Sequence, residues 1–306
     1  MRALVTGASG FAGRHLCAHL AECGDEVVGS DRHPIDSEPA LDVTDRGGTM
    51  AVVGQIAPAV VYHLAGWSDV GGSWRDPVAT LRANAEGTLN VLEAARQAST
   101  ARVLVISSAD VYGIAADEDL PITEDHPLQP VSPYAASKVA ADFLAVQARL
   151  GYGQDVVRAR AFNHLGPGQS DRFVASALAS RIAANERDGG DEVPVGNLAA
   201  RRDFTDVRDV VRAYRLLMER GSAGEAYNVC SGSAVAIQQL ADRLLALADR
   251  PMRLVVDPQR YRPVDVPAVV GDSTRLRKET GWQPEIDLDT TLADILAHWR
   301  HVLGHG

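Results

Sequence analysis

The stretch Thr6-Gly7-Ala8-Ser9-Gly10-Phe11-Ala12-Gly13 decides the fold of this chain. It follows a short apolar run, Arg2–Thr6, and opens a helical pattern that continues to about Glu22. Glycines at this spacing allow a tight turn and a close approach to a ligand, and the start of the helix offers N–H groups to a phosphate. The stretch therefore predicts a strand–turn–helix unit that holds a dinucleotide through Gly7, Ser9, Gly10, Phe11, Ala12 and Gly13.

An acidic residue supports this interpretation. Asp31 ends the second apolar run, Glu26–Ser30, 18 residues after Gly13, where a carboxylate holds the adenosine ribose hydroxyls. A carboxylate repels a 2′-phosphate and favours NAD(H), whereas the neighbouring Arg32 is able to pair with that phosphate, so NADP(H) stays an alternative. Further contacts with the dinucleotide are expected after later strands, at Asp42, Val43, Leu64, Ala65 and Gly66.

Apolar runs alternate with helical patterns through the first half of the chain. Strands are predicted at 2–6, 26–30, 59–63, 102–107 and 155–160, and the main helices at 11–22, 77–98 and 133–150. Continuous apolar strands between helices are typical of a parallel sheet that is covered on both faces. We expect an α/β fold with a Rossmann-type doubly wound parallel sheet over residues 1–162. Residues 163–306 would mainly form a smaller α/β substrate-binding domain, with some segments returning to the first.

The candidate catalytic residues are a tyrosine and a lysine at YxxxK spacing. Tyr134 and Lys138 are four residues apart at the start of a predicted helix, so their side chains share one face. A nearby ammonium and an oxidised nicotinamide favour a phenolate, so we expect the pKa of Tyr134 to be lowered. Ser107 and Ser108 end the fourth predicted strand, at the edge of the sheet where ligands bind.

Together these motifs resemble the extended short-chain dehydrogenase/reductase superfamily over essentially the whole chain. The resemblance implies that Tyr134 is the acid–base and that Lys138 is its electrostatic partner and holds the nicotinamide ribose. It also implies that Ser108 aligns the substrate hydroxyl, while Ser107 contacts the cofactor.

The second half resembles enzymes that act on GDP-4-keto-6-deoxymannose. The similarity lies in Phe162–Gln169 (FNHLGPGQ), Arg202–Val210 and Arg262–Pro267. Arginine forks bind diphosphates well, although surface ion pairs are the other explanation for such arginines. The implied substrate-binding residues are Ser73, Ser108, Asn163, Phe173, Val174, Arg202 and Arg262.

One position distinguishes between the reactions of this group. Sugar 4,6-dehydratases carry a glutamate where this chain has Asp110, whose side chain is one methylene shorter. The resemblance therefore implies a reductase that transfers hydride to C4 of a nucleotide-4-keto-6-deoxyhexose, with Asp110 a further catalytic candidate. A 4-epimerase, a 4,6-dehydratase and a non-catalytic dinucleotide-binding sensor or scaffold remain alternatives, and a dTDP- or UDP-sugar fits the same phosphate contacts.

Composition limits the partners. The chain has 306 residues with 30 Lys and Arg against 40 Asp and Glu, a formal charge of −10, which argues against a nucleic-acid partner. Its three cysteines include no CxxC or zinc spacing, so no metal site is expected. Without a signal-like or membrane-spanning segment, we expect a cytoplasmic protein with no membrane partner. Small residues in the 133–150 helix permit a homodimer through the 77–98 and 133–150 helices.

Overall fold

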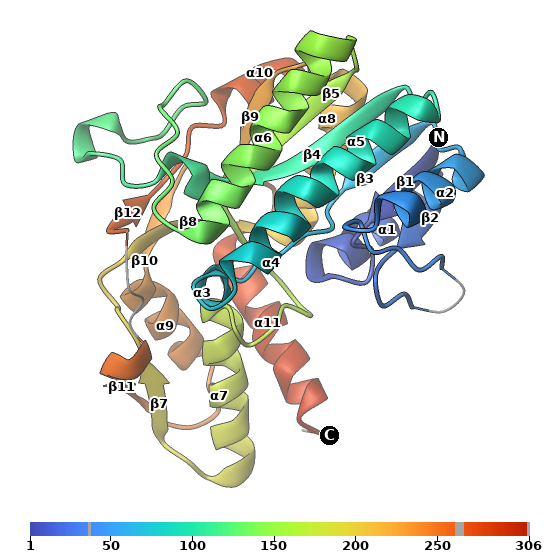
Figure 1. Ribbon diagram of the computed structural model, residues 1–306. Coiled ribbons are helices and arrows are strands. Elements are labelled where there is room, and N and C mark those ends of the chain that lie inside the picture. Colours follow the sequence, from blue (N-terminus) through green and yellow to red (C-terminus); the bar gives the residue numbers. More distant parts are fainter. Residues whose placement is uncertain (36–37, 261–265, 305–306) are drawn as a thin grey trace.

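A parallel sheet of six strands forms the centre of the structure, a computed structural model that describes residues 1–35, 38–260 and 266–304 (Figure 1). The strand order is β2-β1-β3-β4-β5-β9, and all neighbours run parallel. The strands are β1 (Arg2–Thr6), β2 (Glu26–Ser30), β3 (Val60–His63), β4 (Arg102–Ser108), β5 (Val156–Ala161) and β9 (Ala226–Val229). Because the order reverses at β1, a crevice for ligands is expected at the carboxyl ends of β1 and β3.

Helices cover both faces of this sheet. One face carries α2 (Arg46–Ile56), α5 (Gly87–Gln97) and α6 (Pro133–Tyr152), and the other carries α1 (Phe11–Glu22), α8 (Val207–Arg220) and α10 (Thr274–Thr280). Each interface is an apolar core, with Val53 and Val91 buried on the first face and Leu16 and Val210 on the second. Burial on both faces explains why the strands are apolar runs and confirms the predicted doubly wound sheet.

Later segments build a smaller part below the sheet in Figure 1. A second sheet has the order β10-β8-β12, with β6 also paired to β8, and β7 pairs with β11. Here α7 packs against α9 and α11 around Leu178, Leu240 and Leu292. The bounds are β6 (Asn163–Leu165), α7 (Val174–Asp188), β7 (Glu192–Val195), β8 (Arg201–Asp206), β10 (Ala234–Ala236), α9 (Ile237–Ala246), β11 (Arg253–Val256), β12 (Ala268–Val269) and α11 (Leu288–Val302).

The long helix predicted at 77–98 is divided in the structure. It consists of α4 (Pro77–Leu81), one π-helical turn, η1 (Arg82–Glu86), and α5. Such π-turns bulge outward and occur often at functional sites. The remaining short helices are α3 (Val70–Ser73), η2 (Ala109–Tyr112), η3 (Asp117–Asp119) and η4 (Pro258–Arg260).

The helix α2 was not predicted from the sequence, because Gly47, Gly48 and Gly54 lower its helix propensity. It forms because Val53 and Ile56 are buried in the core beside α5. In the described part of the chain, no helix combines the length and apolar character needed to cross a membrane.

Candidate active site

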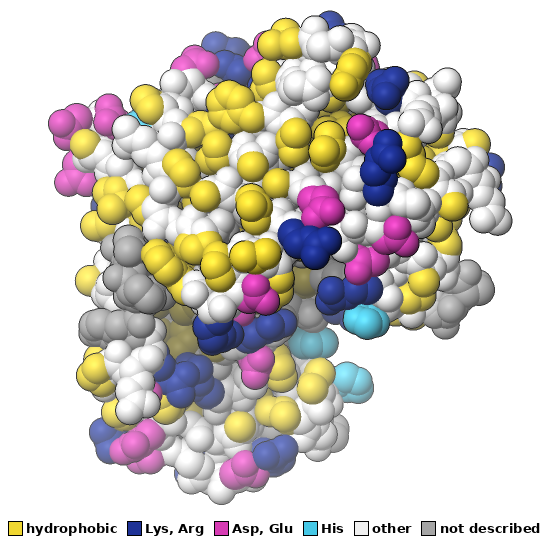
Figure 2. Space-filling model, in the orientation of Figure 1, with side chains coloured by type: hydrophobic (Ala, Val, Ile, Leu, Met, Phe, Trp, Pro, Cys, Tyr) yellow, Lys and Arg dark blue, Asp and Glu magenta, His cyan; other side chains and the backbone are white. Residues whose placement is uncertain are grey.

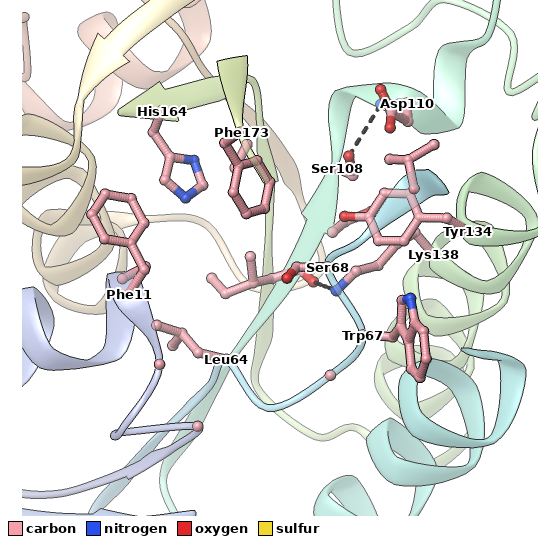
Figure 3. A pocket seen from close by; sticks show the side chains of 18 of the residues that line it. Phe11, Leu64, Trp67, Ser68, Ser108, Asp110, Tyr134, Lys138, His164 and Phe173 are labelled. Carbon is pink, nitrogen blue, oxygen red and sulfur yellow. Dashed lines mark hydrogen bonds between the residues drawn. The ribbon is translucent and has the colours of Figure 1, made fainter. Parts of the chain in front are cut away.

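A cavity of about 640 Å³ follows the carboxyl edge of the central sheet from the glycine turn to α7. In the close view of Figure 3, Phe11, Leu64 and His164 lie on one side and Tyr134 and Lys138 on the other. The sequence-predicted residues that line it are Gly7, Gly10, Phe11, Ala12, Gly13, Asp31, Arg32, Asp42, Val43, Leu64, Ala65, Gly66, Ser107, Ser108, Asp110, Tyr134, Lys138, Asn163, Phe173, Val174 and Arg202.

Two predicted residues are not among those that line the cavity, and a third lies outside the described residues. Ser73 is fully buried and its hydroxyl donates to the carbonyl oxygen of Val70 at 2.7 Å, because α3 turns it into the protein. Ser9 lies at the turn before α1, and its buried hydroxyl has no hydrogen-bond partner among the described residues. Arg262 lies outside the described residues.

The glycine turn brings three backbone segments into close contact. Gly7 adopts a positive φ of 75°, and a Cβ atom there would lie 2.7 Å from the backbone nitrogen of Ala65. A Cβ atom on Gly13 would lie 2.1 Å from the carbonyl oxygen of Gly7. No side chain caps α1 after Gly10, so its first turn lacks the usual side-chain acceptor. These features fit the pyrophosphate of a dinucleotide.

The end of the cavity beside β2 carries charges of both signs. Asp31 follows β2, and its carboxylate accepts a hydrogen bond from the backbone nitrogen of His33 at 3.0 Å. Hydrogen bonds from the Thr44 side chain and backbone hold the pKa of Asp42 below its ordinary value, and the charge of Arg32 acts in the same direction. A carboxylate and a guanidinium, those of Asp31 and Arg32, therefore both line the cavity after β2.

Tyr134 and Lys138 reach the cavity from the first turns of α6. Ser132 caps the helix by accepting a hydrogen bond from the backbone nitrogen of Ala135 at 3.1 Å, and Pro133 occupies the first helical position. Both functional side chains are nearly buried, at 8% and 9% exposure. Lys138 Nζ donates to the carbonyl oxygen of Ile106, on β4, at 2.9 Å.

The protein's own groups raise the pKa of Tyr134, opposite to the prediction. Burial is the main cause, and the charge of Asp110 adds to it, while a hydrogen bond with Ser108 acts in the other direction. Burial also lowers the pKa of Lys138 to about 8. Tyr134 is therefore a neutral phenol over the physiological range, which is the form that donates a proton.

The two serines at the end of β4 have different surroundings. The buried hydroxyl of Ser107 lines the cavity and has no hydrogen-bond partner within the described ranges. Ser108 is the N-cap of η2, and its hydroxyl accepts a hydrogen bond from the backbone nitrogen of Asp110 at 3.2 Å (Figure 3). An orphaned polar atom such as Ser107 Oγ fits a ligand group, and Ser108 is held beside Tyr134.

A residue that sequence analysis missed supports this site from behind. Asn84, in the π-turn, accepts a hydrogen bond from the backbone nitrogen of Trp67 at 2.7 Å and donates to Ser137 of α6 at 2.8 Å. A Cβ atom on Gly66 would lie 2.5 Å from the Asn84 side-chain oxygen. The π-turn thus ties the Gly66–Trp67 loop to α6, and no local pattern at Arg82–Glu86 indicates it.

Other missed residues form the opposite wall. The ring of His164 stacks on Phe11 with centroids 6.0 Å apart and an interplanar angle of 8°, and both line the cavity (Figure 3). His15 hydrogen-bonds the carbonyl oxygen of Pro167 at 3.0 Å, so α1 contacts the loop after β6. Trp67 and Ser68, which were also missed, line another part of the cavity, and Trp67 lies on the Lys138 side (Figure 3). They follow the predicted strand 59–63 by four and five residues, and this position was the available signal.

The other end of the cavity is lined by residues of β6, β8 and the start of α7. Asn163, at the start of β6, is exposed and its amide lies 3.5 Å from the carbonyl oxygen of Asp203. Phe173 precedes α7, and Arg202 lies on β8 with one nitrogen 2.9 Å from the carbonyl oxygen of Arg201. The described residues contain no group of three or more His, Cys, Asp or Glu arranged to hold a metal ion.

The strand order, the glycine turn and the Tyr134–Lys138 pair are those of a dinucleotide-dependent oxidoreductase of the epimerase/dehydratase class. A family model described as GDP-mannose 4,6 dehydratase matches residues 4–295, and the chain belongs to this family. The resemblance inferred from the motifs is confirmed.

Individual relatives match along nearly the full length. GDP-6-deoxy-D-mannose reductase from Pseudomonas aeruginosa is 40% identical over 98% of this chain and 97% of its own. The solved structure of RMD from Pseudomonas aeruginosa complexed with NADPH has a TM-score of 0.88 and 37% identity, and covers 99% of this chain and 100% of that chain. The NAD complex of UDP-glucose 4-epimerase from Thermus thermophilus has a TM-score of 0.88 and 28% identity, covering 98% and 99% of the two chains.

Proposed function

We propose that this protein is a reductase that transfers hydride to C4 of GDP-4-dehydro-6-deoxy-D-mannose and yields GDP-D-rhamnose. The observation that carries this proposal is the 40% identity with GDP-6-deoxy-D-mannose reductase over nearly the whole of both chains. The site agrees with it, because a neutral Tyr134 faces the same cavity as the glycine turn.

The chain's own residues have distinct tasks in this reaction. Ser108 and Tyr134 bind the C4 carbonyl oxygen, and Tyr134 donates its proton to that oxygen as carbon C4 gains hydride. NAD(P)H, when bound, would supply this hydride. The carbonyl double bond thereby becomes a C–H and an O–H bond, and the proton lost from Tyr134 is restored from solvent. The ammonium of Lys138 stabilises the phenolate that remains.

The cofactor is a nicotinamide dinucleotide, and we propose that NAD(H) is favoured while NADP(H) is accepted. Asp31 supports the first, since its carboxylate repels a 2′-phosphate, and Arg32 supports the second. We also propose that residues 1–162 bind this dinucleotide and that 163–306 mainly bind the nucleotide sugar through Asn163, Phe173, Val174 and Arg202.

A direct assay tests the proposed reaction. GDP-mannose, a characterised GDP-mannose 4,6-dehydratase and NAD(P)H are incubated with and without the protein. Protein-dependent loss of NAD(P)H absorbance, with formation of a GDP-6-deoxyhexose by mass spectrometry, is expected. No loss above the control without protein refutes the reductase.

Asp110 keeps the dehydratase as a second candidate, because it lines the cavity near Tyr134. A dehydratase would convert GDP-mannose alone to the 4-keto sugar without net consumption of cofactor, and a 4-epimerase would give GDP-talose. Both products are separable by chromatography. A sensor or scaffold would bind NAD(P)H and turn over none of these sugars.

We further propose that the outer face of α4, α5 and α6 pairs with a second copy of the chain. Large apolar side chains are exposed there, including Val78 at 67%, Phe143 at 57% and Leu150 at 81%, and Figure 2 shows hydrophobic side chains gathered over this part of the molecule. Exposed apolar clusters mark interaction surfaces. Light scattering is expected to give a dimer for the native protein and a monomer for Phe143→Glu. A native monomer refutes this proposal.

A further inference from the structure

One side of α6 carries three functional polar side chains at four-residue spacing. Tyr134, Lys138 and Asp142 follow one another with a drift of only about 40° per step around the helix. The first two line the cavity, whereas Asp142 is 0% exposed and lies behind it. The cavity chemistry described so far does not use this buried carboxylate.

Asp142 is bound by two arginines of the strand beneath α6. Its Oδ1 accepts from Arg158 Nη1 at 2.5 Å, and its Oδ2 accepts from Arg160 Nε at 3.1 Å, with a second Arg160 nitrogen 3.3 Å from Oδ1. Arg158 and Arg160 are two residues apart on β5, so both side chains point to the same face of the sheet, the face that α6 covers. Despite its burial, these bonds hold the pKa of Asp142 below its ordinary value.

Arg160 also extends to the segment that follows Ser108. Its Nη1 donates to Tyr112 Oη at 3.0 Å and to the carbonyl oxygen of Glu124 at 2.9 Å. Tyr112 ends η2, the turn that Ser108 caps, and its own hydroxyl donates to Asn228 Oδ1 at 2.7 Å. The buried guanidinium of Arg160 therefore connects α6, which carries Tyr134, to η2, which follows Ser108. Tyr134 and Ser108 are the two side chains that we propose to bind the C4 carbonyl oxygen.

The other fully buried positions of α6 carry small side chains. Apart from Tyr134, Lys138 and Asp142, its buried residues are Ala135, Ser137, Ala141, Ala145 and Ala148. Small side chains do not interlock deeply with the strands below them. Together with the Lys138–Ile106 and Asn84–Ser137 hydrogen bonds, the carboxylate bridge is a directional contact that distinguishes one rotational setting of α6 from its neighbours, and it is the one that continues through Arg160 to Tyr112.

We propose that the Asp142–Arg160 pair is a positioning device for the reaction, because it sets how α6 is oriented against the Ser108–Tyr112 segment. A buried ion pair gives little net stability over a well-packed apolar pair, so stability alone does not account for it. The expected effect of this pair on kcat rests on the proposed reductase function. Its expected effect on the orientation of α6 does not depend on that function.

The kinetic test compares variants that remove the pair with one that keeps its charge. In Asp142→Asn, kcat for reduction of GDP-4-dehydro-6-deoxy-D-mannose is expected to fall by roughly 10- to 100-fold, because small misplacements are costly in catalysis. KM and the Kd of NADPH should stay within about threefold. Asp142→Glu should recover part of kcat. With 4-deuterated NADPH, the kinetic isotope effect should rise as the chemical step becomes slower.

Two further variants separate positioning from folding. Asp142→Leu combined with Arg158→Met and Arg160→Met removes the carboxylate and both of its guanidinium partners, so no unpaired charge remains, and this triple variant should melt near the native temperature with a lowered kcat. The matched control is Asp155→Asn, which breaks the ion pair with Arg102 (2.8 Å) at the far end of β4. It should alter stability only. The triple variant with native kcat, or an Asp155→Asn variant that loses as much kcat, overturns the proposal.

Hydrogen–deuterium exchange provides a readout that needs no activity. Asp142→Asn should lose protection in the peptides that span 109–113 and 133–140, while Asp155→Asn keeps it. If the native protein reduces no 4-keto sugar but the exchange pattern is as expected, the proposed function fails and the positioning role stands. Unchanged protection in both segments overturns the positioning role whatever the assay shows.

Discussion

Lys138 Nζ and the carbonyl oxygen of Ile106 are 2.9 Å apart, so the ammonium of α6 is attached to the end of β4. The same ammonium approaches the turn after β3, since a Cβ atom on Gly66 would lie 3.8 Å from it. One cation is thus held between the loop on the dinucleotide side and the strand that ends in the two serines. This arrangement is available only when the sheet order places β3 beside β4.

Removing the hydroxyl group of Tyr134 should stop proton transfer and leave the shape of the cavity unchanged. We expect Tyr134→Phe to lower kcat by roughly 10²- to 10⁴-fold, because the proton donor is lost while the ring remains. NADPH binding, measured by fluorescence, should change little. Tyr152→Phe, at the exposed end of the same helix, is the control and should keep native activity. A Tyr134→Phe enzyme with more than about a tenth of native kcat would rule out this assignment.

The loss of activity at alkaline pH should follow the deprotonation of Lys138. Burial lowers its pKa from 10.5 to about 8, so kcat/KM is expected to decline as the pH rises through about 8 and the stabilising ammonium is lost. In Lys138→Arg the charge persists, because a guanidinium stays protonated. The kcat/KM of Lys138→Arg should therefore not decline over the same pH range. An identical alkaline limb in both proteins would assign the titration to another group.

The same shift has a consequence for stability. Between about pH 8 and 10.5 the unfolded chain keeps the Lys138 proton and the folded chain loses it, so this group makes the free energy of unfolding rise with pH. Below about pH 8 both states are protonated and the burial penalty is present in full. The difference in unfolding free energy between the native protein and Lys138→Met should therefore change across this window. Denaturant unfolding at several pH values measures it.

Two glycines offer a matched test of the dinucleotide turn. A Cβ atom on Gly13 would lie 2.1 Å from the carbonyl oxygen of Gly7, so Gly13→Ala must separate α1 from the turn and should weaken NAD(P)H binding by roughly tenfold or more. A Cβ atom on Gly54, in α2, would meet no atom within 4 Å beyond the backbone of its own helix. Gly54→Ala should stabilise the protein by about 0.5–1 kcal/mol and leave binding unchanged. Titration calorimetry and thermal melting distinguish the two.

Asp31 should control the choice between the two nicotinamide cofactors. Asp31→Ser removes the carboxylate that repels a 2′-phosphate, so kcat/KM should rise with NADPH and fall with NADH. Arg32→Ala should have the opposite effect on NADPH, since its guanidinium is lost. Steady-state kinetics with both cofactors provide the comparison. A cofactor ratio that neither substitution changes would exclude this pair as the determinant.

Much of the fold was predictable because local patterns and tertiary packing agree. The strands β1 and β2 and the helix α1 have the bounds that their apolar periodicity indicates. The helix α2 was missed because its three glycines obscure a pattern that only burial beside α5 explains. The π-turn at Arg82–Glu86 likewise has no local signal, since its geometry is set by the contacts of Asn84 with Trp67 and Ser137.

The sequence alone determined the strand–turn–helix unit, the parallel sheet and the Tyr134–Lys138 pair, because glycine spacing, apolar runs and helical periodicity are local properties. Only the tertiary structure decided the protonation of Tyr134 and the partners of Asp142. Burial and Asp110 raise the pKa of the tyrosine, and two strand arginines orient its helix. Desolvation and buried ion pairing depend on residues far apart in the chain, so they exist only once the sheet has brought those residues together.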